Sequence, residues 1–570
     1  MYTGNKLIEL LEKQHQSRHP ELFKKGNFSV VWRAKVGSFP HPDVETIVSA
    51  GEPCGAWKPT PGCPQNLSRP EEKRNVGDNL QFFQNLPLNG YIPGSAIRGL
   101  VRSWAKQRPE VAPRMRELLG YQNDAKITAG KIEFLDAWPE KPTKLTLDIV
   151  NPQQEFQVYH QGQGKPLSFY TLGNGEQPIF VTVAIRGIPN KATAEEVNEV
   201  WEWLKQALSL YGVGSRTASG YGGINTGLSQ PKPDPEDTIK SFDFALYSQG
   251  CYGANPQEID LRPSHWRGWL RSWIFRFLLG VMSEENAQQT LAELLGTLEP
   301  KGIKGCVRLQ MIKVSLWGKH SGNSPRFYAW KGKLKINAPS EILNKIILPV
   351  IRFAVMVGGV GRGWRRPLHI FGMNNGQNAA RGAHLALTHQ VRNAQTNQSE
   401  TKAFGLPLNP EKWNEAYQNW LTAVRSKWPN RINIDINNQQ AWEIFSPATC
   451  AVYAVPGPNA EPVDFSAMEW QETNGVNTRG DGMELIYDPN YKRKIDVGGN
   501  AAGGGNSHCS WVSIKRAKIR HRTENTECQE IVCLFMGGQT AETHHLRADF
   551  LYDLADFQGA VRLFGLTPAP

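Results

Sequence analysis

The chain has 570 residues, of which 40% are apolar, and a formal net charge of +11. That length exceeds one ordinary hydrophobic core and predicts two or three domains, while no run of about 18 uncharged apolar residues is present that would span a membrane. The amino terminus has no apolar h-region and the eight cysteines form no Cys-x-x-Cys pair, which together predict a reduced, cytoplasmic protein. The positive charge suits a polyanionic partner.

The chain opens with a short helix and a strand, followed by a long stretch without periodicity. Residues 7–13 predict the helix, and residues 27–36 alternate like a strand. Residues 37–91 are rich in Gly and Pro, and a loop of that length is usually functional or disordered. Cys54 and Cys63 lie in this loop without a nearby histidine, so buried thiols are expected rather than zinc ligands.

An amphipathic helix then occurs twice. Residues 92–104 read IPGSAIRGLVRSW and residues 261–273 read LRPSHWRGWLRSW, with six of thirteen aligned positions identical. Apolar residues at helical spacing predict a buried stripe in each copy. Another face carries two arginines one turn apart, and Ser95 stands in the first turn. The arginines are Arg98 and Arg102 in the first copy, and Arg267 and Arg271 in the second. A solvated surface is the alternative to a binding role, and the repetition favours binding.

A Gly-rich loop follows a predicted helix in each half of the chain. Residues 211–223 (YGVGSRTASGYGG) follow a helix at 195–210, and residues 358–367 (GGVGRGWRRP) follow one at 341–356. Such loops let a phosphate approach the backbone, and arginine adds a charged fork. Arginine beside an exposed tryptophan also suits single-stranded RNA. The alternatives are a mobile turn for the first loop, and for the second a structural turn whose arginines meet acidic neighbours. The residues predicted to contact RNA here are Gly214, Arg216, Gly220, Gly361, Arg362, Trp364, Arg365 and Arg366.

The remaining pattern predicts two domains. Further strands are predicted at 131–137, 144–150, 179–185, 240–247, 306–316, 511–519 and 530–535, and further helices at 113–119, 283–295 and 410–428. The Pro-rich, charged segment 229–237 predicts a linker between domains at 1–228 and 238–570. Residues 371–510 give little core signal and are interpreted as an insertion in the second domain. The scattered His and Cys residues fit no compact zinc motif.

The repeated helix, the later Gly-rich loops and the strands between them resemble the RAMP superfamily. Its members include backbone subunits of type III CRISPR–Cas effector complexes. The first half is most similar to the sixth Cmr subunit, through IPGSAIRGLVRSW, KIEFLDAWP, LTLDIVNPQ and YHQGQGKPLSF. The second half resembles the first Cmr subunit, through LYSQGCYG, LRPSHWRGWLRSW and GGVGRGWRRP. The resemblance implies an α+β fold with two tandem ferredoxin-like (modified RRM, βαββαβ) domains, which bind CRISPR RNA and target RNA beside a large polymerase-type subunit and other RAMP subunits.

The resemblance also raises the question of catalysis. Some RAMP members cut target RNA with an aspartate in the loop before the repeated helix, and Asp78 matches that place, with Asp43 as a weaker alternative. The corresponding position in the second half is Tyr247, so cutting is expected in the first half at most. No tightly bound cofactor is expected, and Mg²⁺ enters only if target RNA is cleaved. The sixth and first Cmr subunits are not the cutting ones, and a structural aspartate is the alternative.

Two other functions compete with the backbone role. One is a stand-alone endoribonuclease that processes CRISPR RNA, for which His15, His19 and His41 are the available histidines. The other is a generic single-stranded RNA-binding scaffold, which would explain the charge but not the repeated helix and loop.

Overall fold

The computed structural model divides the chain into two compact units. Unit 1 consists of residues 1–151, 166–239 and 308–312, and unit 2 of residues 152–165, 240–307 and 313–570. The structure describes residues 4–36, 39–41, 44–48, 91–123, 126–140, 145–150, 167–173, 178–229, 231–248, 261–297, 302–319, 328–361, 363–372, 378–393, 397–433, 441–458, 479–500, 509–520, 526–538 and 541–569.

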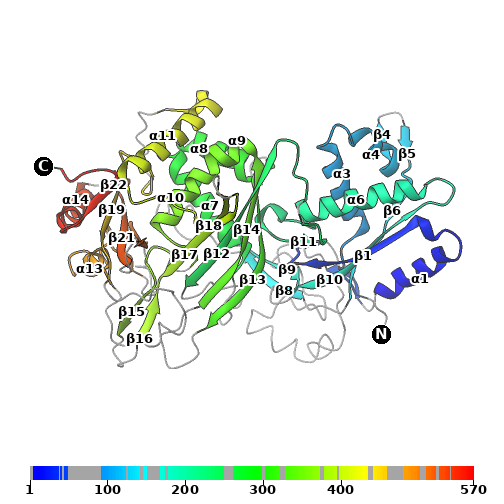
Figure 1. The fold of residues 1–570 in the computed structure, drawn as a ribbon, viewed down its shortest axis with the longest axis horizontal. Coiled ribbons are helices and arrows are strands. Elements are labelled where there is room, and N and C mark those ends of the chain that lie inside the picture. Colours follow the sequence, from blue (N-terminus) through cyan, green and yellow to red (C-terminus); the bar gives the residue numbers. More distant parts are fainter. Residues whose placement is uncertain are drawn as a thin grey trace. The chain divides into compact units, whose positions relative to one another are not determined.

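Unit 1 contains a sheet built from strands far apart in the sequence (Figure 1). Its elements follow one another as β1 (Phe23–Val30), α3 (Gly94–Lys106), β6 (Ile132–Phe134), β10 (Ile179–Gly187), α6 (Ala194–Tyr211) and β11 (Ile224–Asn225). The strands lie in the order β11-β1-β10-β6, with antiparallel pairing throughout. In chain order this is β-α-β-β-α-β, with the fourth strand beside the first and the third between the first and second.

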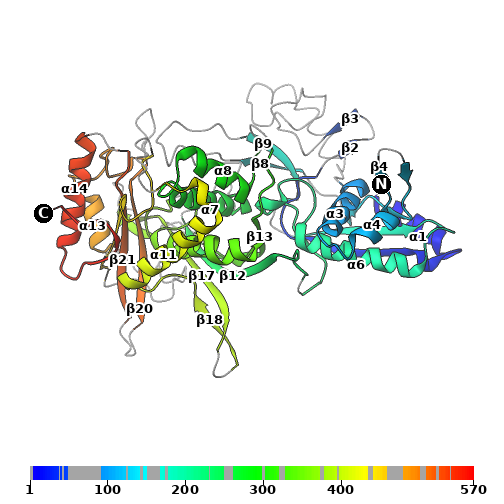
Figure 2. The ribbon, with the colours of Figure 1, turned by 90° about the horizontal axis from the view of Figure 1, so that it is seen from above.

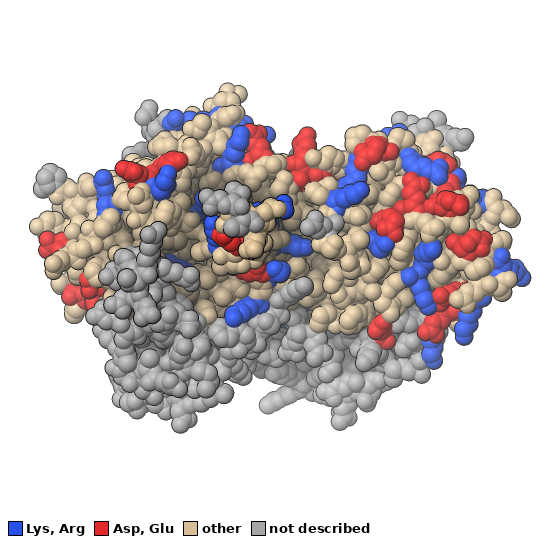
Figure 3. Space-filling model, viewed as in Figure 1, with Lys and Arg blue, Asp and Glu red and all other residues tan. Residues whose placement is uncertain are grey.

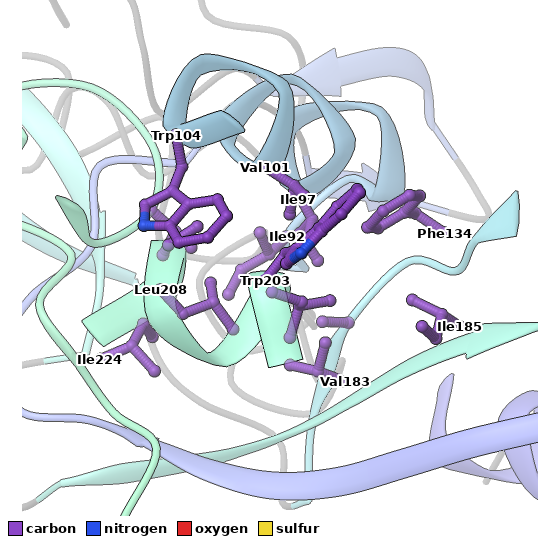
Figure 4. Close-up of a cluster of buried hydrophobic side chains, with 14 of the residues drawn as sticks. Ile92, Ile97, Val101, Trp104, Phe134, Val183, Ile185, Trp203, Leu208 and Ile224 are labelled. Carbon is purple, nitrogen blue, oxygen red and sulfur yellow. The ribbon is translucent and has the colours of Figure 1, made fainter. Parts of the chain in front are cut away.

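The predicted apolar stripes form the core of unit 1. Ile97, Val101 and Trp104 of α3 are buried together with Trp203 and Leu208 of α6. Figure 4 shows these side chains converging between the two helices and the sheet. Thr193 and Glu196 form a capping box that starts α6 where the sequence pattern begins. The smaller elements of the unit are α1 (Gly4–Gln16), η1 (Pro20–Leu22), β2 (Phe39–His41), β3 (Val44–Val48), α4 (Ala112–Leu119), β4 (Tyr121–Asn123), β5 (Lys126–Thr128), β7 (Trp138–Pro139), β8 (Leu145–Val150), β9 (Leu167–Leu172) and η4 (Thr217–Ser219).

The second sheet repeats the order of the first. Its elements are β12 (Asp237–Ser248), α7 (Pro263–Leu278), β13 (Arg308–Lys319), β14 (Tyr328–Pro339), α10 (Leu348–Val357) and β17 (Ala383–Arg392). The strand order is β13-β14-β12-β17-β18, so the third strand again lies between the first and second, and the fourth beside the first. β18 (Ser399–Ala403) continues the sheet as a hairpin with β17, which projects from its sheet in Figure 2. The other elements before residue 432 are α8 (Glu284–Leu295), α9 (Ser340–Ile342), the π-helical turn η5 (Leu343–Ile347), β15 (His369–Gly372), β16 (Asn378–Arg381), α11 (Pro410–Lys427) and η6 (Pro429–Arg431).

A third set with the same order follows in unit 2, and it differs from the sequence prediction. Its elements are β19 (Cys450–Pro456), α13 (Asp481–Tyr487), β20 (Val512–Arg520), β21 (Thr526–Phe535), α14 (Ala541–Asp556) and β22 (Val561–Gly565), with strand order β20-β21-β19-β22. Because β17 already completes the second set, the later residues are an extension with a sheet of its own. Residues 371–510 thus contain β17 of the second set and β19 of the third, and their interpretation as an insertion stays a prediction.

Helix α10 is packed between the second and third sheets of unit 2. It contacts β17 of the second sheet and β20 and β21 of the third. Aromatic rings fill this layer: the centroid of Phe353 lies 5.9 Å from that of Phe564, and Phe445 stacks on Phe564 at 5.2 Å. The largely apolar sequence of α10 follows from this position, and Arg352 is the residue of the helix that stays exposed.

The predicted linker is anchored along its described part. Asp234 is buried, and its carboxylate accepts hydrogen bonds from Arg108 at 3.0 Å and from the Tyr211 hydroxyl at 2.5 Å. Arg108 also donates to the carbonyl oxygens of Lys232 and Pro233. Burial, followed by the neighbouring Asp234, raises the pKa of Tyr211 to about 12. A Pro-rich charged segment is thus held by one buried carboxylate. Within the described residues, no helix is long and apolar enough to cross a membrane.

Candidate nucleic-acid interface

The paired arginines of the repeated helix face the end of the helix that follows. In unit 1, Arg98 donates to the carbonyl oxygen of Leu119, and Arg102 donates to Leu119 at 3.2 Å and also to Gly120. Leu119 is the last residue of α4, whose terminal carbonyls lack partners within the helix. Cations at this end also interact favourably with the helix dipole. Burial, with Arg98 beside it, lowers the pKa of Arg102.

The second copy repeats this arrangement. Arg267 donates to the carbonyl oxygen of Leu295, the last residue of α8, and Arg271 donates to Gly296 at 3.4 Å. The glycines that end the two helices have matching left-handed φ angles, 73° at Gly120 and 81° at Gly296. The shared sequence motif therefore has the same structural role in both copies: its arginines donate hydrogen bonds to the last carbonyl oxygens of the following helix.

The match extends past the sequence motif into the backbone. The amide of Lys131 donates to Leu118 at 2.8 Å, and the amide of Val307 donates to Leu294 at the same distance. Both bonds join the entry to the next strand with the last turn of the capped helix. Helix, arginine pair, glycine and strand entry thus form one repeated structural unit.

The RNA-binding role of these arginines stays a prediction, but the structure shows that they differ in their exposure to solvent. Ser95 and Arg98 are exposed, whereas Arg102, Arg267 and Arg271 are half-buried. Ser95 does not cap α3: the Gly94 amide donates instead to the Asp136 carboxylate at 2.7 Å. Asp136 was missed by sequence reasoning, because it stands 42 residues away.

The first Gly-rich loop is a folded turn. The Val213 amide donates to Gly222 at 2.8 Å, Ser215 to Lys35 at 2.8 Å, and Gly222 to Arg33 at 2.7 Å. These bonds tie the loop to the chain that follows β1, and they occupy part of its backbone N–H groups. A Cβ at Gly214, where φ is 80°, would lie 2.3 Å from the Lys35 carbonyl oxygen. Glycine is therefore required there by both conformation and space.

The outer edge of this loop is formed by Gly214, Ser215 and Arg216. Gly214 and Ser215 are exposed, Arg216 is half-buried, and Gly220 is buried. Arg216 has φ 59°, a left-handed conformation that is costly for a side chain other than Gly, Asn or Asp. Arg33 and Lys35 lie beside the loop. Their contact with it could not be predicted from the alternating sequence in which they stand.

In the second Gly-rich loop, the described large side chains pack against the interior of unit 2. The Gly359 amide donates to Trp364 at 2.9 Å, and the Trp364 ring lies 6.0 Å from that of Trp273, edge to face. Trp364 is half-buried and packs in unit 2, which leaves less of its ring open than the sequence predicts, and its contact with RNA stays a prediction. The ring fills the space above Gly358, where a Cβ would lie 2.8 Å from it.

Arg365 and Arg366 are also engaged in the interior of unit 2. Arg365 is buried and pairs with Glu443, and Arg366 donates to the Val512 carbonyl at 2.6 Å and to Ser510 at 2.7 Å. Burial lowers the pKa of Arg366 to about 10. The alternative of arginines that meet an acidic neighbour describes Arg365, and its geometry gives no support to an RNA contact.

Glu443 accepts a second arginine from α7. Arg276 and Glu443 are both fully buried, and Arg276 donates to the same carboxylate through Nε at 2.7 Å. Such an Arg–Glu–Arg group depends on all three members, because one charge left without its partner in the interior is costly. Sequence reasoning missed Glu443, which stands in an otherwise unremarkable segment, AWEIF.

Three predicted site residues lie outside the described residues: Asp43, Asp78 and Arg362. Gly361, which is described, has φ 87° and is half-buried. Among the residues that the structure describes, no group of three His, Cys, Asp or Glu side chains could hold a metal ion. Because Asp78 is not among these residues, the structure does not test whether it binds Mg²⁺.

The charges on one face of the molecule are mixed. Figure 3 shows acidic and basic side chains interspersed over unit 1. Several belong to one network, in which Arg114 and Lys131 both pair with Glu196, at 3.1 Å and 2.8 Å. RNA binding on this face would rest on local geometry and not on a broad basic stripe.

Comparison with known proteins identifies part of this fold. Residues 46–225 match the model of the RAMP superfamily. The predicted RAMP resemblance is thereby confirmed for the segment that contains α3, its arginine pair, α6 and the first Gly-rich loop. No curated protein matches the chain.

Two solved structures are similar to parts of the chain. One is a cryo-EM structure of the type III-B Cmr-beta bound to cognate target RNA, with 15% identity, 39% of this chain and 66% of that chain covered, and a TM-score of 0.25. The other is the crystal structure of Cmr6 from Pyrococcus furiosus, with 19% identity, 36% of this chain and 98% of that chain covered, and a TM-score of 0.19. With TM-scores this low, neither structure is used to infer the fold or the role of the chain.

Proposed function

We propose that the chain is a backbone subunit of a type III CRISPR–Cas effector complex that binds CRISPR RNA and target RNA. The observation that carries the proposal is the RAMP match over the segment that contains the repeated helix and the first Gly-rich loop. The recurrence of the β-α-β-β-α-β order supports tandem ferredoxin-like domains, which a fusion of sixth-type and first-type Cmr subunits would contain. The partners are then the guide, its target, the polymerase-type subunit and other RAMP subunits.

The RNA backbone passes over the exposed edge of the first loop in this proposal. Gly214 and Ser215 leave room for a phosphate, and Arg216 supplies the charged fork. Arg98 is the exposed member of its pair and adds a second cation. In unit 2 the contact shifts to Gly361 and Arg362, since Trp364, Arg365 and Arg366 pack inward.

Protein–RNA cross-linking tests this assignment. The full chain, assembled with CRISPR RNA, is irradiated and its cross-linked peptides are identified. We expect cross-links at residues 214–216 and none at residues 364–366. Cross-links confined to parts of the chain outside both loops would contradict the proposal.

Target cleavage at Asp78 is the catalytic part of the proposal. A carboxylate beside a kinked target nucleotide would act as a base or hold Mg²⁺, helping the 2′-OH attack the adjacent phosphate. Asp78→Ala should remove cleavage at one position of the target, while Asp43→Ala should leave it. If Asp78→Ala leaves cleavage at every position unchanged, the chain binds RNA without cutting it by this route.

The processing endonuclease remains a separate hypothesis with its own test. The purified chain alone is incubated with precursor CRISPR RNA. We expect no processing, whereas specific cleavage would replace the backbone role with that of a stand-alone endoribonuclease.

A further inference from the structure

Unit 1 contains a cavity at one end of its sheet, far from the Gly-rich loop. Its volume is about 340 Å³, and its lining comes from the end of α1, from β6, and from the end of β10 with the turn that follows. The titratable and charged side chains of the lining are His15, Arg18, His19, Glu133 and Arg186. A cavity with two guanidinium groups, two imidazoles and one carboxylate favours an anion.

The carboxylate is already engaged. Glu133 accepts a hydrogen bond from Nε of Arg186 at 2.5 Å, a bond that does not use the two Nη groups of the same guanidinium. Arg18 is exposed at the rim of the cavity. The His19 imidazole lies 3.7 Å from the Glu21 carboxylate. The cavity thus keeps a net positive lining even with Glu133 ionised.

His15 points to a ligand independently of these charges. Its side chain is 8% exposed, and its Nδ1 atom is buried without a hydrogen-bond partner among the described residues. Its ring lies 5.7 Å from Phe23, so the residue is held in place on its apolar side. An unpartnered buried nitrogen costs free energy, and an acceptor in the cavity would satisfy it once the ring is protonated. Burial, followed by Arg186, lowers the pKa of His15 in the empty cavity.

The register of the sheet separates this cavity from the Gly-rich loop. Phe23 pairs with Arg186 at one end of β1, and Val30 pairs with Ile179 at the other. The Gly-rich loop meets the chain just after Val30, where the Val31 amide donates to Gly223 at 3.0 Å. Seven steps along the strand correspond to about 23 Å. One phosphate cannot occupy both places.

We propose that this cavity binds the phosphate group of a nucleotide or of RNA, held by Arg18 and Arg186 with His15 as a further donor. The proposal rests on the proposed function only for RNA as the source of the phosphate. A terminal phosphate, an internal phosphodiester and inorganic phosphate share the chemistry, and they differ in size and in charge.

Calorimetry on the full chain separates these sources. The probes are uridine 5′-monophosphate, the dinucleotide UpU and inorganic phosphate. We expect at least one of them to bind, and Arg18→Gln to weaken that binding about tenfold, the usual effect of losing one charge-assisted hydrogen bond. Arg116→Gln, an exposed arginine of α4 outside the cavity, is the matched control and should leave binding unchanged.

Proton uptake provides a second readout. Because the pKa of His15 is lowered in the empty cavity, an anion that restores its charge should take up protons on binding near pH 7. Measured in two buffers of different ionisation enthalpy, the uptake should fall in His15→Gln. If this buried variant does not fold, the exposed Arg18→Gln still tests the site.

The result that overturns the proposal is binding of none of the three probes, or equal binding by the wild type, Arg18→Gln and Arg186→Gln. Arg216→Gln distinguishes the two proposals, since it should weaken binding of a long RNA and leave the binding of uridine monophosphate unchanged.

Discussion

The two Gly-rich loops start from similar sequences and differ in how far their residues are packed into the interior. Each follows the second helix of a β-α-β-β-α-β set, and each contains glycines with left-handed φ angles. The first leaves Gly214 and Ser215 exposed, whereas the second buries Arg365 against Glu443. The two loops differ in their surroundings, because the second loop contacts the buried carboxylate of Glu443 and strand β20. A glycine–arginine pattern therefore marks a tight turn, and the surroundings decide whether it is open to a ligand.

The largest effect is expected from Glu443→Ala. It would leave Arg276 and Arg365 buried without their shared carboxylate, which typically costs about 3–5 kcal/mol. Chemical denaturation should show a lower free energy of unfolding for the transition of unit 2. Glu415→Ala is the control, because Glu415 forms an exposed pair with Lys412, and its effect should stay within about 0.5 kcal/mol. Equal stabilities of the two variants would contradict the role of the buried group.

Gly214→Ala tests the first loop. The added Cβ would be strained at φ 80° and would meet the Lys35 carbonyl oxygen, so a loss of about 1–3 kcal/mol is expected for unit 1. Gly227→Ala is a control with a similar φ, 83°, and open space around the Cβ. The difference between the two thermal unfolding midpoints isolates the clash. A smaller shift in Gly214→Ala than in Gly227→Ala would show that the loop rearranges freely.

The arginine pairs should behave alike in the two copies. Arg102→Gln and Arg271→Gln each remove bonds to carbonyls at a helix end, with an expected loss of about 1–2 kcal/mol. Thermal unfolding measures both, with Arg116→Gln as the control. Should only one variant lose stability, the two helix ends would not be equivalent, despite their shared sequence.

Elements with a strong apolar period could be predicted from the sequence. The stripe of Ile97, Val101 and Trp104 predicts α3, and the predicted helix at 195–210 corresponds to α6, whose capping box at Thr193 and Glu196 was not predicted. The third β-α-β-β-α-β set escaped prediction, because its first helix, α13, has only seven residues and lacks the arginine motif. The sequence therefore predicts an insertion at residues 371–510, the range in which β19 and α13 of this set lie.

The site was harder to predict than the fold, since its side chains depend on partners distant in the sequence. The repetition of Arg98 and Arg102 was recognised, but their nearest acceptors stand at Leu119 and Gly120, beyond the next helix. Glu443 is 78 residues from Arg365 and has no local signature. Sequence patterns thus located the repeated helices and the Gly-rich turns, and they could not tell which arginines face the interior.

The most direct test of the central claim is the salt dependence of guide RNA binding by Arg216→Gln and Arg102→Gln. We expect Arg216→Gln to weaken binding about tenfold and to reduce the slope of log K against log salt by about one, as for a lost phosphate contact. Arg102→Gln should bind guide RNA like the wild type at a temperature where both are folded, because its guanidinium serves the end of α4. An unchanged affinity in Arg216→Gln, or an equal loss in Arg102→Gln, would contradict this account.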